Sequence, residues 1–248
     1  MIAALPANAQ KDGMKTVAYN DGNQKLNGIA IGPENGKSTR PGILILPAWR
    51  GIQPHEKEVA KKLSAMGYYV FIADIYGEGN YPKDNAEAGK QAGYYKKNYK
   101  DYQRRIRLAL EQLVRSGANK DNVAMIGYCF GGTGVLEAAR AGMPVKGVVS
   151  FHGGLGRDAS RPVEKINTKI LVCHGAIDPN VPQSEIDAFQ KEMNDSKADW
   201  QMIYYAGAVH AFTEPTAGND ISKGVAYNEA ADRRSWQHMK DFFAEILK

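Results

Sequence analysis

Three residues of this 248-residue chain have the types and the order that nucleophilic catalysis needs. Cys129, Asp178 and His210 each follow a short apolar run. In such a trio the cysteine attacks a carbonyl carbon and the histidine moves the proton. The aspartate fixes the histidine tautomer and stabilises the imidazolium. The three residues therefore predict acyl-transfer chemistry at one site.

The segment GYCFG at positions 127–131 is the most informative part of the chain. An apolar run precedes it and a helical pattern follows it, which is the nucleophile-elbow pattern with cysteine in place of serine. Because so sharp a turn brings the neighbouring backbone close, Gly127 and Gly131 avoid collisions that side chains would cause. The following helix N-terminus favours a thiolate at Cys129 and offers the Phe130 N–H as an oxyanion donor. The alternative is a buried cysteine that acts as a small hydrophobic residue.

The two partners of the cysteine stand in loops after predicted strands. Asp178 lies in HGAIDP, just past the strand predicted at 170–173, where Gly and Pro turns can hold it against an imidazole. The alternative is a turn or helix-capping aspartate. His210 lies in AGAVHAF after the strand predicted at 200–206, and the alternative is a core or surface histidine. The loop after residues 43–46 is expected to supply a second oxyanion donor, the Trp49 N–H.

The other histidines are expected to have other roles. His152 follows a predicted strand and is expected to line the pocket, whereas His174 precedes a turn glycine and is interpreted as structural. His55 and His238 lie on predicted helices and are interpreted as solvated. No spacing of His, Cys, Asp and Glu in the sequence resembles a metal site, and no phosphate-binding glycine motif follows a strand. The sequence therefore predicts neither a metal nor a cofactor.

Short apolar runs alternate with helical patterns, which is typical of β-α units around a mostly parallel sheet. The predicted strands are 17–19, 26–31, 42–48, 69–73, 122–127, 146–151, 169–174 and 200–206. The predicted helices are 54–66, 99–115, 131–141, 182–193 and 224–247, and residues 75–95 are expected to form a long surface loop. The first two strands are expected to pair in antiparallel fashion. The predicted fold class is α/β, with helices on both faces of the sheet and one domain over residues 11–248.

Composition excludes several classes of protein. Hydrophobic residues make up 43% and charged residues 24%, as in globular proteins, and no run of 18 apolar residues predicts insertion into a membrane. The net charge is +5, but lysine and arginine are spread along the chain. Their densest stretch, 94–107, has helical spacing, so no nucleic-acid partner is predicted. The two cysteines do not form a disulfide scaffold, and the sequence carries no signal for the oligomeric state.

Residues 1–10, MIAALPANAQ, contain small residues in an A-x-A pattern before a polar start, as at the end of a secretory signal peptide. The basic part and most of the apolar part of such a signal are missing. The segment is interpreted as a signal-peptide remnant or a disordered leader. The corresponding expectation is a periplasmic or secreted protein, with a cytoplasmic protein as the alternative.

From Gly42 to the C-terminus the chain resembles the dienelactone hydrolase family of α/β-hydrolases. The resemblance rests on GYCFGG at the elbow, HGxxD before Val-Pro, the VHxF loop at 209–212 and the stretch 226–236. It implies an α/β-hydrolase fold and a triad that acts on small-molecule esters or lactones through an acyl-enzyme, without a cofactor. It places this triad on Cys129, Asp178 and His210.

Three positions depart from the family pattern. Family members carry a glutamate that contacts the resting thiol where this chain has Ala48, so Cys129 is expected to pair directly with His210. They also bind a substrate carboxylate with two arginines, and the matching positions here hold Glu78 and Glu214. If both acids line the pocket, each repels a close anion by up to about 4 kcal/mol, and the site prefers neutral or cationic esters.

Further pocket residues are expected from the same loops. They are Arg50, which could partly compensate the acids, Tyr76 and Phe212. The principal prediction is a hydrolase of small carboxylic esters or lactones. Two alternatives remain: a non-catalytic binding member of the family with a vestigial triad, and a basic protein that binds nucleic acid or a charged surface.

Overall fold

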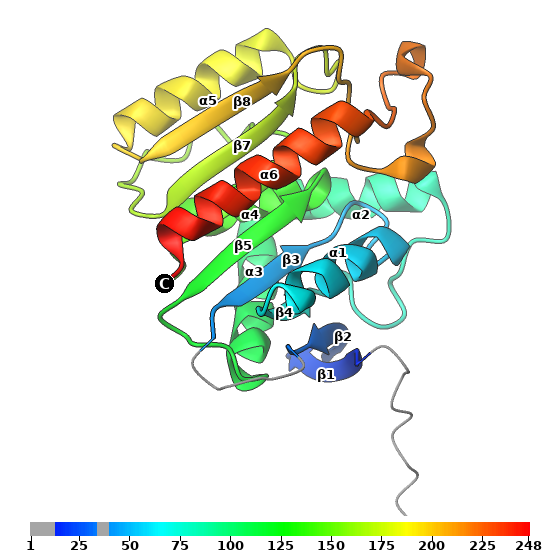
Figure 1. The fold of residues 1–248 in the computed structure, drawn as a ribbon, viewed down its shortest axis with the longest axis vertical. Coiled ribbons are helices and arrows are strands. Elements are labelled where there is room, and N and C mark those ends of the chain that lie inside the picture. Colours follow the sequence, from blue (N-terminus) through cyan, green and yellow to red (C-terminus); the bar gives the residue numbers. More distant parts are fainter. Residues whose placement is uncertain (1–12, 34–39) are drawn as a thin grey trace, which may run out of the picture.

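The computed structural model describes residues 13–33 and 40–248 (Figure 1). The strands are β1 Lys15–Asp21, β2 Gln24–Ile31, β3 Gly42–Leu46, β4 Tyr69–Ile72, β5 Val123–Tyr128, β6 Gly147–Phe151, β7 Lys169–Gly175 and β8 Trp200–Tyr205. The helices are α1 Pro54–Ala65, α2 Asn85–Lys97, α3 Tyr99–Arg115, α4 Phe130–Arg140, α5 Gln183–Asp195 and α6 Glu229–Ile246. Two short 3-10 helices, η1 Pro215–Ala217 and η2 Ile221–Lys223, precede α6.

All eight strands join one sheet in the order β1-β2-β4-β3-β5-β6-β7-β8. β1 pairs with β2 and β2 with β4 in antiparallel fashion. The remaining neighbours, from β4 through β3 to β8, are all parallel. The expected α/β-hydrolase fold, with a mostly parallel sheet and an antiparallel entry pair, is confirmed.

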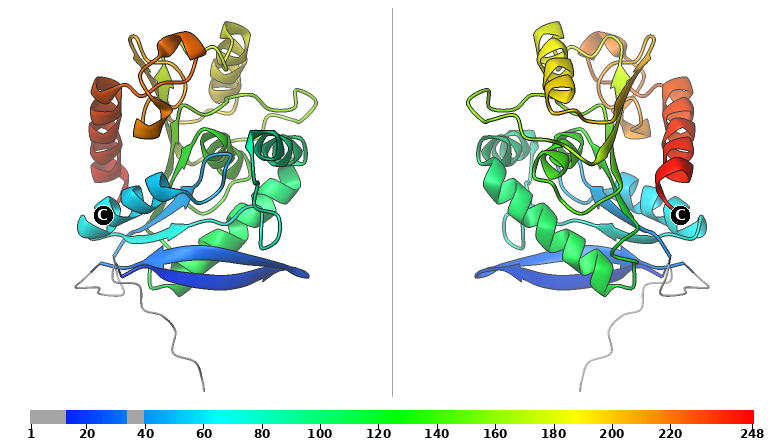
Figure 2. Two further views of the ribbon diagram at one scale, coloured as in Figure 1. Left: turned by 90° about the vertical axis from the view of Figure 1, so that its right-hand side faces the viewer. Right: turned by 90° about the vertical axis from the view of Figure 1, so that its left-hand side faces the viewer.

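Helices cover both faces of the sheet, and each face has its own apolar core (Figure 2). Residues of α2, α3, α4 and α5 pack on one face, and residues of α1 and α6 pack on the other. In β3, Leu44 and Leu46 belong to the first core, whereas Ile43 and Ile45 belong to the second. A strand buried on both faces must be apolar throughout, which explains the GILIL run.

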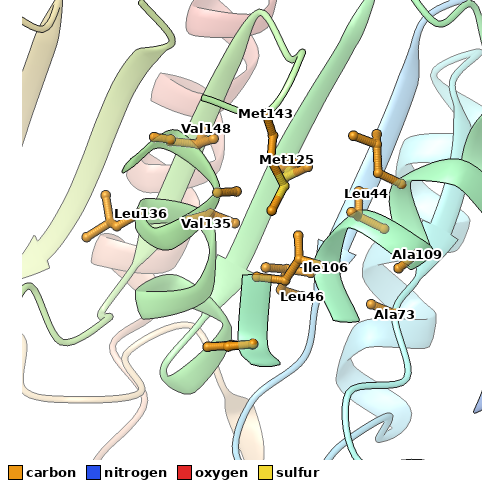
Figure 3. Packing of buried hydrophobic residues seen from close by; sticks show 14 of the residues in the cluster. Leu44, Leu46, Ala73, Ile106, Ala109, Met125, Val135, Leu136, Met143 and Val148 are labelled. Atoms are coloured by element: carbon orange, nitrogen blue, oxygen red, sulfur yellow. The ribbon is translucent and has the colours of Figure 1, made fainter. Parts of the chain in front are cut away.

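Figure 3 shows how α3 and α4 fix the central strands. Ile106 of α3 and Val135 of α4 lie among the buried side chains of β3 and β5, including Leu44 and Met125. Burial of one such side chain stabilises the fold by about 1.5–3 kcal/mol. This packing holds the ends of the central strands in place, which matters because the candidate site lies at those ends.

Helix α2 forms where the sequence predicts a loop. The side chain of Asp84 caps it by accepting a 2.8 Å hydrogen bond from Glu87 N–H. Its buried residues are Ala88, Ala92 and Tyr95. Two of the three are alanines, so the apolar stripe is too weak for hydrophobic periodicity to reveal the helix.

The last helix is shorter than predicted. Gly224 ends η2 with a φ of 71°. A continuous α-helix cannot contain this left-handed conformation, so the helix begins only after it. Asn228 then caps α6 by accepting a hydrogen bond from Ala231 N–H at 3.0 Å.

The interpretation of residues 1–10 as a leader lies outside the described residues. Within the described part of the chain, the helices are too short or too polar to cross a bilayer.

Candidate active site

Cys129 lies on a strained turn between β5 and α4. Its φ of 52° and ψ of −111° fall in a region that residues with side chains rarely occupy. A Cβ on Gly127 would lie 2.0 Å from Gly131 O, and a Cβ on Gly131 would lie 2.0 Å from Leu46 O. Both distances are far below van der Waals contact, so only glycine fits. The predicted elbow geometry, with glycines two residues on either side of the cysteine, is confirmed.

His210 and Asp178 form a hydrogen-bonded pair at the ends of β8 and β7. His210 Nδ1 lies 2.8 Å from Asp178 Oδ2. The Asp178 side chain is fully buried, and its other oxygen accepts a hydrogen bond from Asn180 N–H at 2.8 Å. The backbone of His210 is fixed by Gly224 O and Ala226 N–H at 3.2 and 3.1 Å. Because Nδ1 faces the aspartate, Nε2 is left for the hydrogen bond between His210 and Cys129.

The Cys129 thiol and the His210 imidazole shift each other's pKa. Burial alone would raise the pKa of Cys129, but the hydrogen bond and charge of His210, the charge of Lys96 and the Phe130 N–H together lower it. For His210, burial acts to lower the pKa, and the contacts with Asp178 and Cys129 more than offset it, so this pKa is raised. Both shifts favour the ion pair of thiolate and imidazolium over the neutral pair.

His152 and Phe212 lie behind His210, which corrects the expectation that they line an open pocket. Their exposed fractions are 2% and 0%. The His152 ring packs edge-on against the rings of His210 and Phe212, with centroids 5.2 Å apart in both pairs. His152 Nε2 also shares a 2.8 Å hydrogen bond with Thr213 Oγ1. Burial, followed by the charge of His210, lowers the pKa of His152 well below its usual value, so the ring stays neutral. Both residues help to set the position of the His210 ring.

The loop after β3, which carries Trp49, passes beside the elbow. A Cβ on Gly131 would lie 2.8 Å from Pro47 O, so this loop touches the first turn of α4. Trp49 and Cys129 pack against the same apolar core. Among the residues that the structure describes, no group accepts a hydrogen bond from Trp49 N–H. The Phe130 N–H is directed at the sulfur of Cys129. This arrangement suits the predicted pair of oxyanion donors.

Tyr76 is 2% exposed and supports the loop beside the elbow, so it does not line an open pocket as expected, and Arg50 points elsewhere. The buried Tyr76 hydroxyl donates a 2.7 Å hydrogen bond to Trp49 O, and its ring stacks on Phe130 with centroids 5.9 Å apart. Arg50 is exposed, and its Nε donates to Asn85 Oδ1 at 3.0 Å at the start of α2. Arg50 is thus held by the first residue of α2. It does not offset the negative charge of the two acids as expected.

The two acids that replace the family arginines lie in different places. Glu78 is exposed, and its carboxylate pairs with Lys25 Nζ and accepts from Asn27 Nδ2, both at 2.8 Å and both on β2. Glu214 caps η1 and lies 3.6 Å from His55 Nδ1 at the start of α1. Glu78 therefore lies against β2, which corrects its assignment to the pocket, and Glu214 lies near the start of α1.

Sequence reasoning missed Lys96 because it missed helix α2. The charge of Lys96 is one of the causes that lower the pKa of Cys129. Lys96 also lines a cavity of about 280 Å³ next to the first turn of α4, with Tyr99, Thr133 and Gly154 among its neighbours there. Because Glu78 faces β2 and a lysine acts on the thiol, only Glu214 still supports the expected preference for neutral or cationic esters, which stays a prediction.

The second cysteine differs from the first in every respect that matters for reactivity. Cys173 is 0% exposed, burial raises its pKa to about 12, and Tyr205 Oη donates to its sulfur at 3.5 Å. Tyr205 Oη also shares a 2.8 Å hydrogen bond with His238 Nδ1, so His238 is not the solvated residue expected. His55 is likewise half-buried, with its ring packed edge-on against Tyr128. The described residues contain no group of three or more His, Cys, Asp or Glu that could hold a metal ion.

Comparisons with known proteins bear on the fold and the family of the chain. The model of the dienelactone hydrolase family matches residues 26–247. Among solved structures, the chain is similar to the dienelactone hydrolase-like promiscuous phosphotriesterase P91 from metagenomic libraries, with 35% identity, a TM-score of 0.89, and coverage of 95% of this chain and 98% of that one. It is 30% identical over 187 residues to a Bradyrhizobium protein named "Probable 2-oxo-3-(5-oxofuran-2-ylidene)propanoate lactonase", covering 70% of this chain and 74% of that protein. The chain is therefore a hydrolase that belongs to the dienelactone hydrolase family.

Proposed function

We propose that the protein hydrolyses small carboxylic esters or lactones through an acyl-enzyme on Cys129. The observation that carries the proposal is the geometry at the elbow, where Cys129 is hydrogen-bonded to His210 and Asp178 Oδ2 lies 2.8 Å from His210 Nδ1. The lowered pKa of Cys129 favours the thiolate, which attacks without first losing a proton. The lactonase and phosphotriesterase relatives support ester and lactone cleavage by this fold.

In the first half-reaction, Cys129 Sγ attacks the carbonyl carbon and a C–S bond forms while the carbonyl electron pair moves to oxygen. The amides of Phe130 and Trp49 stabilise this oxyanion. When the tetrahedral intermediate collapses, the bond from carbon to the leaving oxygen breaks. His210 gives its proton to that oxygen, which leaves as an alcohol or, in a lactone, stays attached as a free hydroxyl.

In the second half-reaction, the neutral His210 removes a proton from water as the water oxygen attacks the thioester. Collapse of the second intermediate expels the Cys129 thiolate and releases the carboxylic acid. Asp178 stabilises the imidazolium that forms again at the end. No cofactor enters either half-reaction.

Turnover of an activated aryl ester by the wild type and by Cys129→Ala tests the proposal. We expect the variant to lose at least about 1,000-fold in kcat, and we expect mass spectrometry of the acid-quenched wild-type reaction to show the acyl adduct on the peptide that contains Cys129. Cys173→Ala is the matched control, because it removes the other thiol, and it should remain active. Full turnover by Cys129→Ala would refute the mechanism.

The alternative, a binding member with a vestigial triad, makes the opposite prediction for the wild type. It requires that no acyl adduct forms and that Cys129 reacts with iodoacetamide no faster than an ordinary cysteine. An ester panel that varies acyl length and charge would then identify the substrate class if turnover is found.

A further inference from the structure

We propose that Glu56 and Tyr76 are positioning residues that fix the Trp49 amide as an oxyanion donor by holding its loop from two sides. The inference rests on the proposed function and extends it to two residues outside the triad. Neither residue would touch the reacting atoms. Each would act through the backbone of the loop at 48–53.

Glu56 is a buried carboxylate with a backbone function. It is 1% exposed and lies in the first turn of α1. Its Oε1 accepts a hydrogen bond from Ala48 N–H at 3.1 Å, and its Oε2 accepts one from Gln53 N–H at 2.9 Å. One side chain therefore holds both ends of the loop. Above its pKa of about 7 the Glu56 carboxyl is ionised, and hydrogen bonds from an N–H to a carboxylate are stronger than those to a neutral acceptor.

Tyr76 holds the same loop from the other side. Its hydroxyl donates to Trp49 O at 2.7 Å, and its ring stacks on Phe130, the residue that carries the other oxyanion donor. A Cβ on Gly51 would lie 3.7 Å from the Tyr76 ring, so the ring also covers the turn. Tyr76 thus contacts both residues whose amides are expected to hold the oxyanion.

The peptide group between Ala48 and Trp49 lies between these two attachments. Its carbonyl oxygen accepts a hydrogen bond from Gly51 N–H at 2.9 Å. Glu56 holds the N–H before this peptide group, and Tyr76 holds the C=O after it. The Trp49 N–H, which has no acceptor among the described residues, is therefore fixed in direction before substrate binds. Donors that need no reorganisation when charge develops are what makes an oxyanion hole effective.

The test separates acyl transfer from thiol reactivity. In Tyr76→Phe and Glu56→Gln, we measure kcat and KM for an activated aryl ester and the rate at which iodoacetamide alkylates Cys129. Alkylation displaces iodide from a saturated carbon and forms no oxyanion, so it reports the thiolate alone. We expect kcat to fall about 10- to 100-fold in each variant, with KM and the alkylation rate within about twofold of wild type.

Matched controls come from the same elements. Tyr81→Phe removes a hydroxyl that donates to Asp74 Oδ2 at 2.7 Å in the loop that also carries Tyr76, and Glu58→Gln alters an exposed acid of α1. Both should keep the wild-type kcat. If kcat in Tyr76→Phe and Glu56→Gln matches the controls, or if alkylation falls together with kcat, the positioning role is overturned.

A second measurement does not depend on activity. Amide hydrogen exchange in peptides that cover residues 47–53 should become faster in both variants and stay unchanged in both controls. Unchanged exchange in the variants would overturn the inference. If the wild type turns over no ester at all, the proposed function fails, and hydrogen exchange still decides whether Glu56 and Tyr76 fix the loop.

Discussion

Replacing Glu56 by glutamine should stabilise the protein at and above neutral pH while leaving its stability near pH 4.5 almost unchanged. Burial raises the pKa of Glu56, the N–H groups of Ala48 and Gln53 offset part of this effect, and the charge of Glu214 adds to it. The resulting pKa is about 7, against a usual value of 4.5. Between these two values the folded protein keeps a proton that the unfolded chain releases. The stability that this group contributes is therefore present below pH 4.5 and is lost as the pH rises through 7.

The size of the effect follows from the shift. One pKa unit corresponds to about 1.4 kcal/mol, so the change from 4.5 to about 7 corresponds to about 3 kcal/mol. Solvent screens little of this, because Glu56 is 1% exposed. Glutamine resembles the protonated acid: it is uncharged and keeps one carbonyl acceptor. The difference in free energy of unfolding, variant minus wild type, should therefore rise by about 3 kcal/mol between about pH 4.5 and pH 8.

Urea unfolding followed by circular dichroism across this pH range measures the difference. The two proteins share their other titrating groups, so the difference curve isolates Glu56. The control Glu58→Gln alters an exposed side chain that pairs with Lys61 at 2.9 Å, and its difference curve should be flat. Parallel curves for wild type and Glu56→Gln would refute the account of a costly buried carboxylate. Confirmation would mean that the substitution that stabilises the fold also slows acyl transfer, a trade between stability and activity.

Further predictions concern the site and its supports. Burial acts to raise the pKa of Cys129, but the contacts with His210 more than offset it, so this pKa is lowered. Alkylation by iodoacetamide should therefore stay fast at pH values below those at which an ordinary thiol ionises. Asp178→Asn should move this alkylation profile to higher pH and lower kcat by about 10⁴-fold, and an unchanged profile would contradict the proposed pairing. Thr213→Val removes the partner of His152 Nε2 and should lower the free energy of unfolding by about 1–3 kcal/mol in urea, and a neutral result would argue against His152 as a support. Gly131→Ala would place a Cβ 2.0 Å from Leu46 O and should cost about 3 kcal/mol or more. Gly93→Ala, in helix α2 with nothing within 4 Å, should be neutral or stabilising by up to about 1 kcal/mol in the same thermal or urea assay.

The sequence predicts the central sheet and the elbow because both follow from local rules. A strand buried on both faces must be apolar along its whole length, as β3 is, and the Gly127 and Gly131 contacts leave room for no side chain. Helix α2 escapes prediction since its buried face is mostly alanine, and Lys96 is missed with it.

The supports of the site are harder to predict, because they depend on contacts between distant segments. His152 follows its strand just as a pocket residue would, and the packing of Phe212 and Thr213 decides that it is covered. Glu56 looks in the sequence like an ordinary helix-capping glutamate, since it is the third residue of α1 and accepts from Gln53 N–H. Its second oxygen reaches Ala48, eight residues away, and only the path of the loop after β3 makes this possible.

The contrast between the two cysteines allows folded molecules to be quantified by thiol labelling. The Cys129 thiol is partly exposed and its pKa is lowered, whereas the Cys173 thiol is buried in the core and its pKa is raised to about 12. At neutral pH a thiol reagent should therefore consume one equivalent per folded molecule, and a second only after denaturation. The fraction of intact enzyme in any preparation can thus be read from label stoichiometry before a single substrate is known.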